Sequence, residues 1–189
     1  MSINPFFLKR LFFVLIALIC FSCISSYAEP LLLSVKSTPY DRQMSRIRPV
    51  LLSTFHQSGD EVSLRLVNHW IGDLRSIPYG FTRVWKTPAE TESGAPADCK
   101  AKAVALYERM KACGASHFRL IIGRRTPSSR STHAWVEWET SNGTYILDPT
   151  INWMAYRSSD LSSRWYIPYY AFAGAHKYRA ASTTLVAQN

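Results

Sequence analysis

Hydrophobic residues recur at helical spacing in two segments of the chain. From Asp60 to Leu74 an apolar residue comes at every fourth position, which predicts an amphipathic helix that Ser58 or Asp60 can cap. From Cys99 to Cys113 the apolar residues again form one stripe. Asp98 can cap this second helix and Gly114 can end it. The charged residues expected outside the stripe are Lys100, Lys102, Glu108, Arg109 and Lys111.

Alternation of apolar and polar residues replaces the helical spacing after Gly114. Residues 118–122 and 132–139 read as two strands, and Asn142-Gly143 is a strong hairpin signal that leads into a third strand ending at Asp148. In the second strand the two faces carry different sets: Ala134, Val136 and Trp138 on one, His133, Trp135 and Glu137 on the other. A helix followed by an antiparallel meander predicts the α+β class, with the helix packed on the sheet. After Pro149 the chain is rich in Tyr and Trp and shows no clear period.

The hydrophobic run near the N-terminus has a different character. Lys9 and Arg10 precede an unbroken apolar stretch, and Ser26-Tyr27-Ala28 places small residues where a signal peptidase reads them. We therefore expect residues 1–28 to be a cleaved signal peptide and residues 29–189 to form one domain, with its core at about residues 60–150. A membrane anchor is less favoured, because the run is short against the ~20 residues that span a bilayer. The sequence thus predicts a periplasmic or secreted protein with no stable membrane span after signal removal.

The charge balance is basic. The chain has 22 basic and 13 acidic residues, and removal of residues 1–28 leaves a net charge of +7. Such a surface suits nucleic acid, anionic envelope polymers or acidic proteins, and export makes nucleic acid the least expected of these. The loop from Arg124 to Arg130 concentrates this charge beside the predicted strand that carries His133. It is either a solvated loop or a lip over the site that selects acidic substrates.

Two cysteines, Cys99 and Cys113, remain after signal removal. They lie at opposite ends of one predicted helix, roughly 21 Å apart, whereas a disulfide needs Cα atoms within about 7 Å. We expect both to be free thiols, which is unusual for an exported protein and favours a nucleophile. Cys99 falls in the first turn of the helix, where unpaired N–H groups and the helix dipole favour a thiolate. The alternative is an inert cysteine that extends the apolar stripe, a description that suits Cys113 better.

The predicted hairpin constrains how His133 and Asp148 meet. With Asn142 and Gly143 as the two turn residues, paired residue numbers sum to 285, and His133 lies opposite Asn152 rather than Asp148. This register requires a bulge, or a bend at Pro149, to bring Asp148 to the His133 ring.

Three short strings resemble the transglutaminase-like superfamily, above all its bacterial cysteine peptidases of the periplasm. The strings are Ala97-Asp98-Cys99-Lys100, His133-Ala134-Trp135-Val136 and Ile146-Leu147-Asp148, with weaker matches upstream at residues 67–68, 77–79 and 85–90. The likeness covers residues 61–148. It implies a papain-like α+β fold in which a thiol at a helix N-terminus faces a histidine and an aspartate on a sheet.

The resemblance also implies roles for the residues. Cys99 would be the nucleophile, His133 the base and then the acid, and Asp148 the group that orients the imidazole. The Cys99 N–H would form part of the oxyanion hole, with a side chain of Asn68 or Trp85 as the second donor. Acidic residues beside the cysteine are linked with calcium in the periplasmic branch. Lys100 stands where the family usually has glutamate, so we expect neither a metal nor another cofactor.

The expected function is that of an exported thiol enzyme that cleaves an amide bond in a protein or peptide through a thioacyl intermediate. If the basic loop from Arg124 to Arg130 selects the substrate, we expect that substrate to be acidic. Two alternatives remain open on sequence grounds. The enzyme could pass the acyl group to an amine, as a transglutaminase does, or the fold could serve as an inactive binding module.

Overall fold

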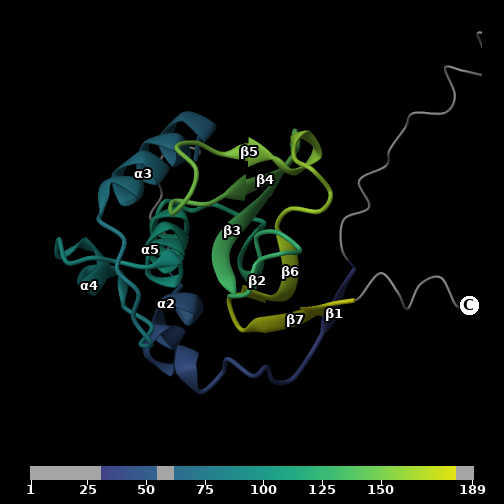
Figure 1. Ribbon diagram of the computed structural model, residues 1–189, viewed down its shortest axis with the longest axis horizontal. Helices are drawn as coiled ribbons and strands as arrows, with labels where there is room; N and C mark the ends of the chain where they lie inside the picture. Colours follow the sequence, from purple (N-terminus) through teal and green to yellow (C-terminus); the bar gives the residue numbers. More distant parts are fainter. Residues whose placement is uncertain (1–30, 55–61, 182–189) are drawn as a thin grey trace, which may run out of the picture.

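The computed structural model describes residues 31–54 and 62–181, which form a seven-stranded antiparallel sheet with helices gathered against one side (Figure 1). The order across the sheet is β1-β7-β6-β2-β3-β4-β5. The strands are β1 (Leu32–Ser34), β2 (Phe118–Arg124), β3 (His133–Thr140), β4 (Gly143–Leu147), β5 (Tyr156–Arg157), β6 (Ile167–Ala173) and β7 (His176–Ala180). The helices are α2 (Arg48–Leu52), α3 (Leu64–Ser76), α4 (Pro88–Glu92) and α5 (Cys99–Ala112), with 3₁₀ turns η1 (Gln43–Ile47) and η2 (Ser158–Asp160). The predicted α+β class is confirmed.

The two predicted helices are present as α3 and α5. Helix α5 begins at Cys99, where the Asp98 side chain accepts a hydrogen bond from the Ala101 N–H at 3.2 Å. It ends at Ala112, just before Gly114 adopts a left-handed φ of 80°. Helix α3 begins at Leu64, later than predicted, because the Ser63 hydroxyl supplies the cap. The expected caps at positions 58 and 60 lie outside the described residues, as does the predicted signal peptide.

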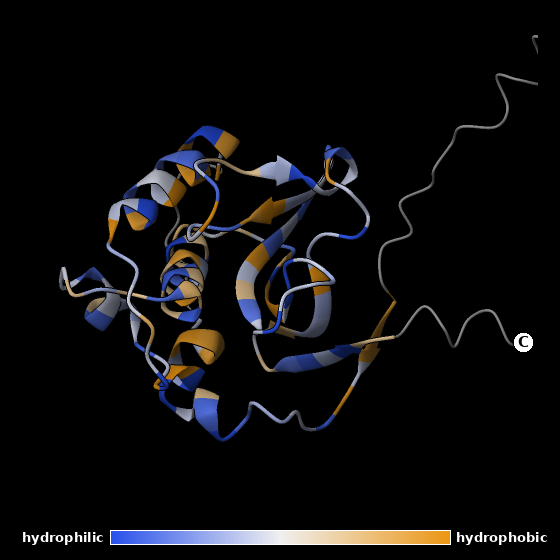
Figure 2. Cartoon of the chain, in the orientation of Figure 1, coloured by the Kyte–Doolittle hydropathy of each residue, from blue (hydrophilic) through white to orange (hydrophobic). Residues whose placement is uncertain are grey.

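Helix α5 is the central helix of the domain. It lies between the sheet and the other helices (Figure 1), and the run from Ala101 to Tyr107 is buried without interruption. The prediction of one apolar stripe with Lys102 outside it was therefore wrong. Lys102 is only 2% exposed, and its ammonium group donates to the Ile77 carbonyl at 2.5 Å. Helix α3 is amphipathic as expected, and apolar and polar residues alternate along it in Figure 2.

Strand β3 separates two clusters of apolar side chains. Ala134 and Val136 belong to the large core that faces the helices. Trp135, on the other face, packs in a smaller cluster with Ile121 and Tyr166. The predicted division of this strand into two faces is confirmed.

The β3–β4 hairpin has a different register from the predicted one. Thr140 pairs with Gly143 and Val136 with Leu147, so paired numbers sum to 283 instead of 285. The turn closes one residue earlier because the Thr140 hydroxyl donates to the Gly143 carbonyl at 3.0 Å. Continued by one position, this register places Asp148 opposite Trp135. His133 is then the diagonal neighbour of Asp148 on the same face, within reach without a bulge.

No helix in the described residues is long and apolar enough to cross a membrane.

Candidate active site

Cys99 lies at the start of α5, on the wall of a cleft of about 480 Å³. Its side chain is partly exposed, and it makes no disulfide. Cys113 caps the other end of the same helix and is also free. The expectation of two free thiols is confirmed. Both pack against the core, and of the two only Cys99 also lines the cleft.

His133 and Asp148 form a close pair. Nε2 of His133 lies 2.7 Å from Oδ2 of Asp148, whose side chain is completely buried. The other carboxylate oxygen, Oδ1, accepts hydrogen bonds from the N–H groups of Thr150 at 3.0 Å and Ile151 at 3.3 Å. These contacts fix the orientation of the carboxylate beside the imidazole.

The pKa of His133 is set by burial and by its neighbours Asp148 and Cys99. Burial disfavours the imidazolium, but hydrogen bonds and charge from Asp148 and Cys99 outweigh it and raise the pKa of His133 from 6.5 to about 9. Since Nε2 faces Asp148, Nδ1 is the ring nitrogen left for the Cys99 sulfur. The raised pKa favours an imidazolium at neutral pH, placed between the side chains of Asp148 and Cys99. The structure brings together the three residues that the sequence singled out.

Tyr166 is a member of this network that the sequence did not reveal. Its hydroxyl donates to Oδ2 of Asp148 at 3.0 Å and accepts from the Asn152 side chain at 3.1 Å. Burial and the nearby Asp148 charge raise the pKa of Tyr166, so the hydroxyl keeps its proton. The ring meets Trp135 edge-on at 5.3 Å, and Trp135 stacks with His133 at 6.2 Å. The residue lies in the tail that showed no period, and its backbone has a left-handed φ of 53°, which no local pattern indicates.

The loop before α5 also lines the cleft and is tied to the helix start. Asp98 is 1% exposed, and its Oδ2 accepts from the Thr82 N–H at 3.1 Å. The Lys100 ammonium group bonds both the Asp98 carboxylate and the Thr82 carbonyl. These contacts fix the loop against the residues on either side of Cys99.

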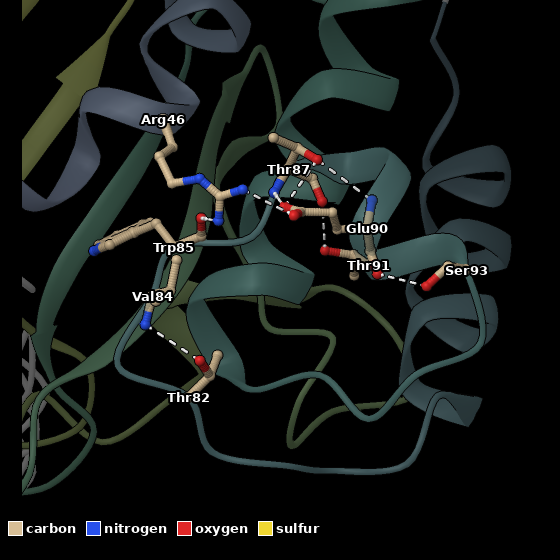
Figure 3. A network of polar contacts seen from close by, with 8 residues as sticks. All are labelled: Arg46, Thr82, Val84, Trp85, Thr87, Glu90, Thr91 and Ser93. Atoms are coloured by element: carbon tan, nitrogen blue, oxygen red, sulfur yellow. Dashed lines mark hydrogen bonds and ion pairs between the residues drawn. The ribbon is translucent and has the colours of Figure 1, made fainter.

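A second network holds the far end of this loop (Figure 3). Arg46 donates to the Trp85 carbonyl at 3.4 Å and to the Glu90 carboxylate at 2.9 Å. Glu90 in turn completes a capping box with Thr87 at the start of α4. Trp85 is thereby held in place, and its side chain is 3% exposed at the edge of the cleft.

The two proposed oxyanion donors occupy different places. Trp85 lines the cleft with Cys99. Asn68 lies on α3 and is not among the cleft-lining residues; its Oδ1 accepts from the Ala155 N–H at 2.8 Å. That contact orients Asn68 toward the loop after β4. Of the two, only Trp85 is positioned along the cleft.

The chain has a transglutaminase-like α+β fold. Among solved structures, Legionella pneumophila LapG treated with EGTA matches with a TM-score of 0.54 and 15% identity, over 77% of this chain and 80% of that one. Calcium-bound LapG matches with a TM-score of 0.52 and 15% identity, over 78% and 85%. At this identity the likeness shows the fold alone. No family model and no curated protein matches the chain.

One of the matched LapG structures is calcium-bound. Calcium takes six to eight oxygen ligands. The described residues contain no group of three or more His, Cys, Asp or Glu side chains able to hold a metal ion. Beside Cys99, the Asp98 carboxylate is already bonded to the Lys100 cation. These residues do not fit a calcium ion.

Proposed function

We propose that the chain is an exported cysteine peptidase or amidase with a catalytic triad. Cys99 is the nucleophile, His133 is the base and then the acid, and Asp148 orients the imidazole. The observation that carries the proposal is the His133–Asp148 pair at 2.7 Å, with the Cys99 thiol on the other side of the imidazole. The transglutaminase-like fold supports the proposal, since it is the fold that the motif resemblance implies. Export to the periplasm or beyond rests on the signal-like sequence of residues 1–28.

The proposed reaction is acyl transfer to water. The Cys99 thiolate attacks the amide carbonyl carbon, and the charge that develops on oxygen faces the N–H groups at the start of α5. The His133 imidazolium donates its proton to the amide nitrogen as the C–N bond breaks, which leaves a thioester on Cys99. Water then attacks the thioester while His133 takes a proton from it, and cleavage of the C–S bond releases the acid and restores the ion pair. Asp148 stabilises the imidazolium throughout.

Alkylation with iodoacetamide tests the reactive thiol directly. We expect Cys99 to react at pH 6.5 many times faster than a model thiol, because only the thiolate is alkylated and the adjacent imidazolium stabilises it. Cys113 provides an internal comparison, and peptide mapping by mass spectrometry measures both rates in one sample. Hydrolysis should disappear in Cys99→Ala and persist in Cys113→Ala. A Cys99 that reacts no faster than the model thiol contradicts the proposal.

Product analysis with and without an added primary amine separates hydrolysis from transfer. We expect the free acid as the main product in both, and a dominant amide product would assign the chain to the amine-transfer alternative. Reactive Cys99 without any turnover would favour the binding module.

A further inference from the structure

A second hollow of about 490 Å³ adjoins the cleft that holds Cys99. Ser131 and Thr132 line both, so the two form one continuous surface. These residues immediately precede His133 on β3. A peptide whose scissile bond lies at Cys99 can therefore continue past Ser131 and Thr132 into this second hollow.

The chemistry of the second hollow is cationic. Arg124 and Arg130 line it together with Ser128, Ser129 and the two shared hydroxyl residues, and no acidic side chain takes part. Arg124 and Arg130 have no carboxylate partner within the described residues. Arg119, five residues earlier on the same strand, is by contrast paired with Glu137 at 2.9 Å.

Arg124 has hydrogen-bonding capacity to spare. Its guanidinium donates to the Pro127 carbonyl at 3.3 Å, while its buried Nε finds no partner in the part of the chain that the structure describes. A buried donor without an acceptor is unfavourable, and an incoming acceptor removes that penalty. Planar carboxylates are the side-chain groups that a guanidinium binds best, through two parallel hydrogen bonds.

The hollow is positioned by the sheet and by its own turn. Arg124 is the last residue of β2, and the preceding residue, Gly123, pairs with His133. The Arg124 guanidinium also lies 5.7 Å from the centre of the Tyr169 ring on β6. The turn that follows is closed by hydrogen bonds between Thr126 and Ser129. The guanidinium is thus held at a fixed offset from the imidazole.

We propose that this hollow is a substrate subsite for the carboxylate of an Asp or Glu side chain, a few residues from the scissile bond. The inference rests on the proposed peptidase function and adds to it a determinant of specificity. It also gives the basic loop predicted from sequence a role, with Arg124 at the end of the strand and Arg130 across the turn.

Cleavage-site profiling tests the subsite. The mature protein is incubated with a proteome-derived peptide library, and mass spectrometry reads the sequence around each cut. We expect Asp or Glu to be enriched at one position on one side of the cut. For a peptide taken from that set, replacement of the acidic residue by Gln should lower kcat/KM about 10-fold, the effect of one charge-assisted contact.

Arginine variants then assign the preference to the hollow. In Arg124→Gln and Arg130→Gln the Glu-to-Gln ratio of kcat/KM should fall toward one, and Arg130→Glu should favour a peptide with Lys at that position. Arg65→Gln is the matched control, because Arg65 is an exposed residue of α3 that lines neither hollow. It removes the same charge and should keep the ratio of the parent protein.

The outcomes separate the two proposals. Cleavage without acidic enrichment, or an enrichment that survives in both arginine variants, overturns the subsite and leaves the peptidase in place. The absence of any Cys99-dependent cleavage overturns the peptidase, and the subsite with it.

Discussion

Asp148 is the residue on which the contacts of the site converge. Both of its oxygens are used: Oδ2 by His133 and Tyr166, Oδ1 by the N–H groups of Thr150 and Ile151. The tyrosine and the histidine therefore share one oxygen of one carboxylate. We infer that Tyr166 is a positioning residue, which acts on the imidazole through the charge and orientation of Asp148.

Replacement of Tyr166 by Phe tests this role, since it removes the hydroxyl and keeps the ring. The loss of a hydrogen bond to a charged group should lower kcat about 10-fold. With one donor fewer, Asp148 retains more negative charge, so the pKa of His133 should rise further. The basic limb of the pH–rate profile should consequently move to higher pH.

The matched control is Tyr178→Phe, because Tyr178 packs against the same small cluster from β7. It should leave both kcat and the profile unchanged. A merely structural role for Tyr166 would lower the melting temperature and leave the basic limb of the profile where it was.

At the residue scale, the sequence predicts the site side chains that lie next to local signals. Cys99 follows a capping aspartate at a helix start, and His133 and Asp148 border a hairpin, all of which short strings encode. Tyr166 has no such signal. Its importance comes from contacts between segments far apart in the chain and from a backbone φ of 53°, which the fold imposes.

At the scale of elements, the contact between β2 and β6 depends on one glycine. A Cβ atom at Gly123 would lie 2.2 Å from the carbonyl oxygen of Ile167 and 2.7 Å from the Trp135 ring. Gly123 also pairs with His133, and the β2–β6 register shifts beside it. The close approach of the strands thus occurs at the residue that pairs with His133.

Gly123→Ala should therefore weaken both stability and activity. Either β6 or the Trp135 ring must move, and overpacking of this kind costs about 1–3 kcal/mol of the free energy of unfolding. Urea denaturation measures that loss, and kcat/KM should fall in the same variant because Trp135 stacks with His133.

Gly72→Ala is the control for the same chemical change. An added Cβ at Gly72, inside α3, meets nothing within 4 Å. Alanine is favoured over glycine in a helix interior by roughly 0.8–1 kcal/mol, so this variant should be more stable than the parent. Equal effects of the two substitutions would contradict the packing argument.

The elements differ in how far the sequence predicts them. The helix over residues 99–112 and the β3–β4 hairpin follow from local periodicity and caps. The hairpin register does not, because a Thr140 side-chain bond closes the turn early. Strands β6 and β7 lie in the aromatic tail, where packing on both faces of the sheet removes simple alternation. Their place beside β2 is set by long-range pairing.

For the whole molecule, the raised pKa of His133 links stability to pH. An unfolded histidine titrates near 6.5 and the folded one at about 9. Because the folded pKa is the higher one, its contribution is fully present below pH 6.5 and is lost as pH rises through 9. We expect the free energy of unfolding to fall by up to about 3 kcal/mol across this range.

Urea unfolding of the parent protein and of His133→Gln at pH 6, 7.5 and 9 measures this linkage. The dependence on pH should be largely absent in His133→Gln and retained in His69→Gln, which changes an exposed histidine on α3. A parent protein whose stability stays constant from pH 6 to 9 would contradict an imidazolium held between Asp148 and Cys99.

Helix α5 also acts as a spacer between two sulfur atoms. In the native fold it holds Cys99 and Cys113 at its opposite ends, beyond the reach of a covalent bond. A disordered chain has no such restraint, and an oxidant would join the two thiols into a small loop incompatible with the helix. The timing of oxidation relative to helix formation thus decides whether a newly made molecule matures or is trapped. Preparations refolded without a reductant should accumulate a compact, inactive monomer that dithiothreitol returns to the active form.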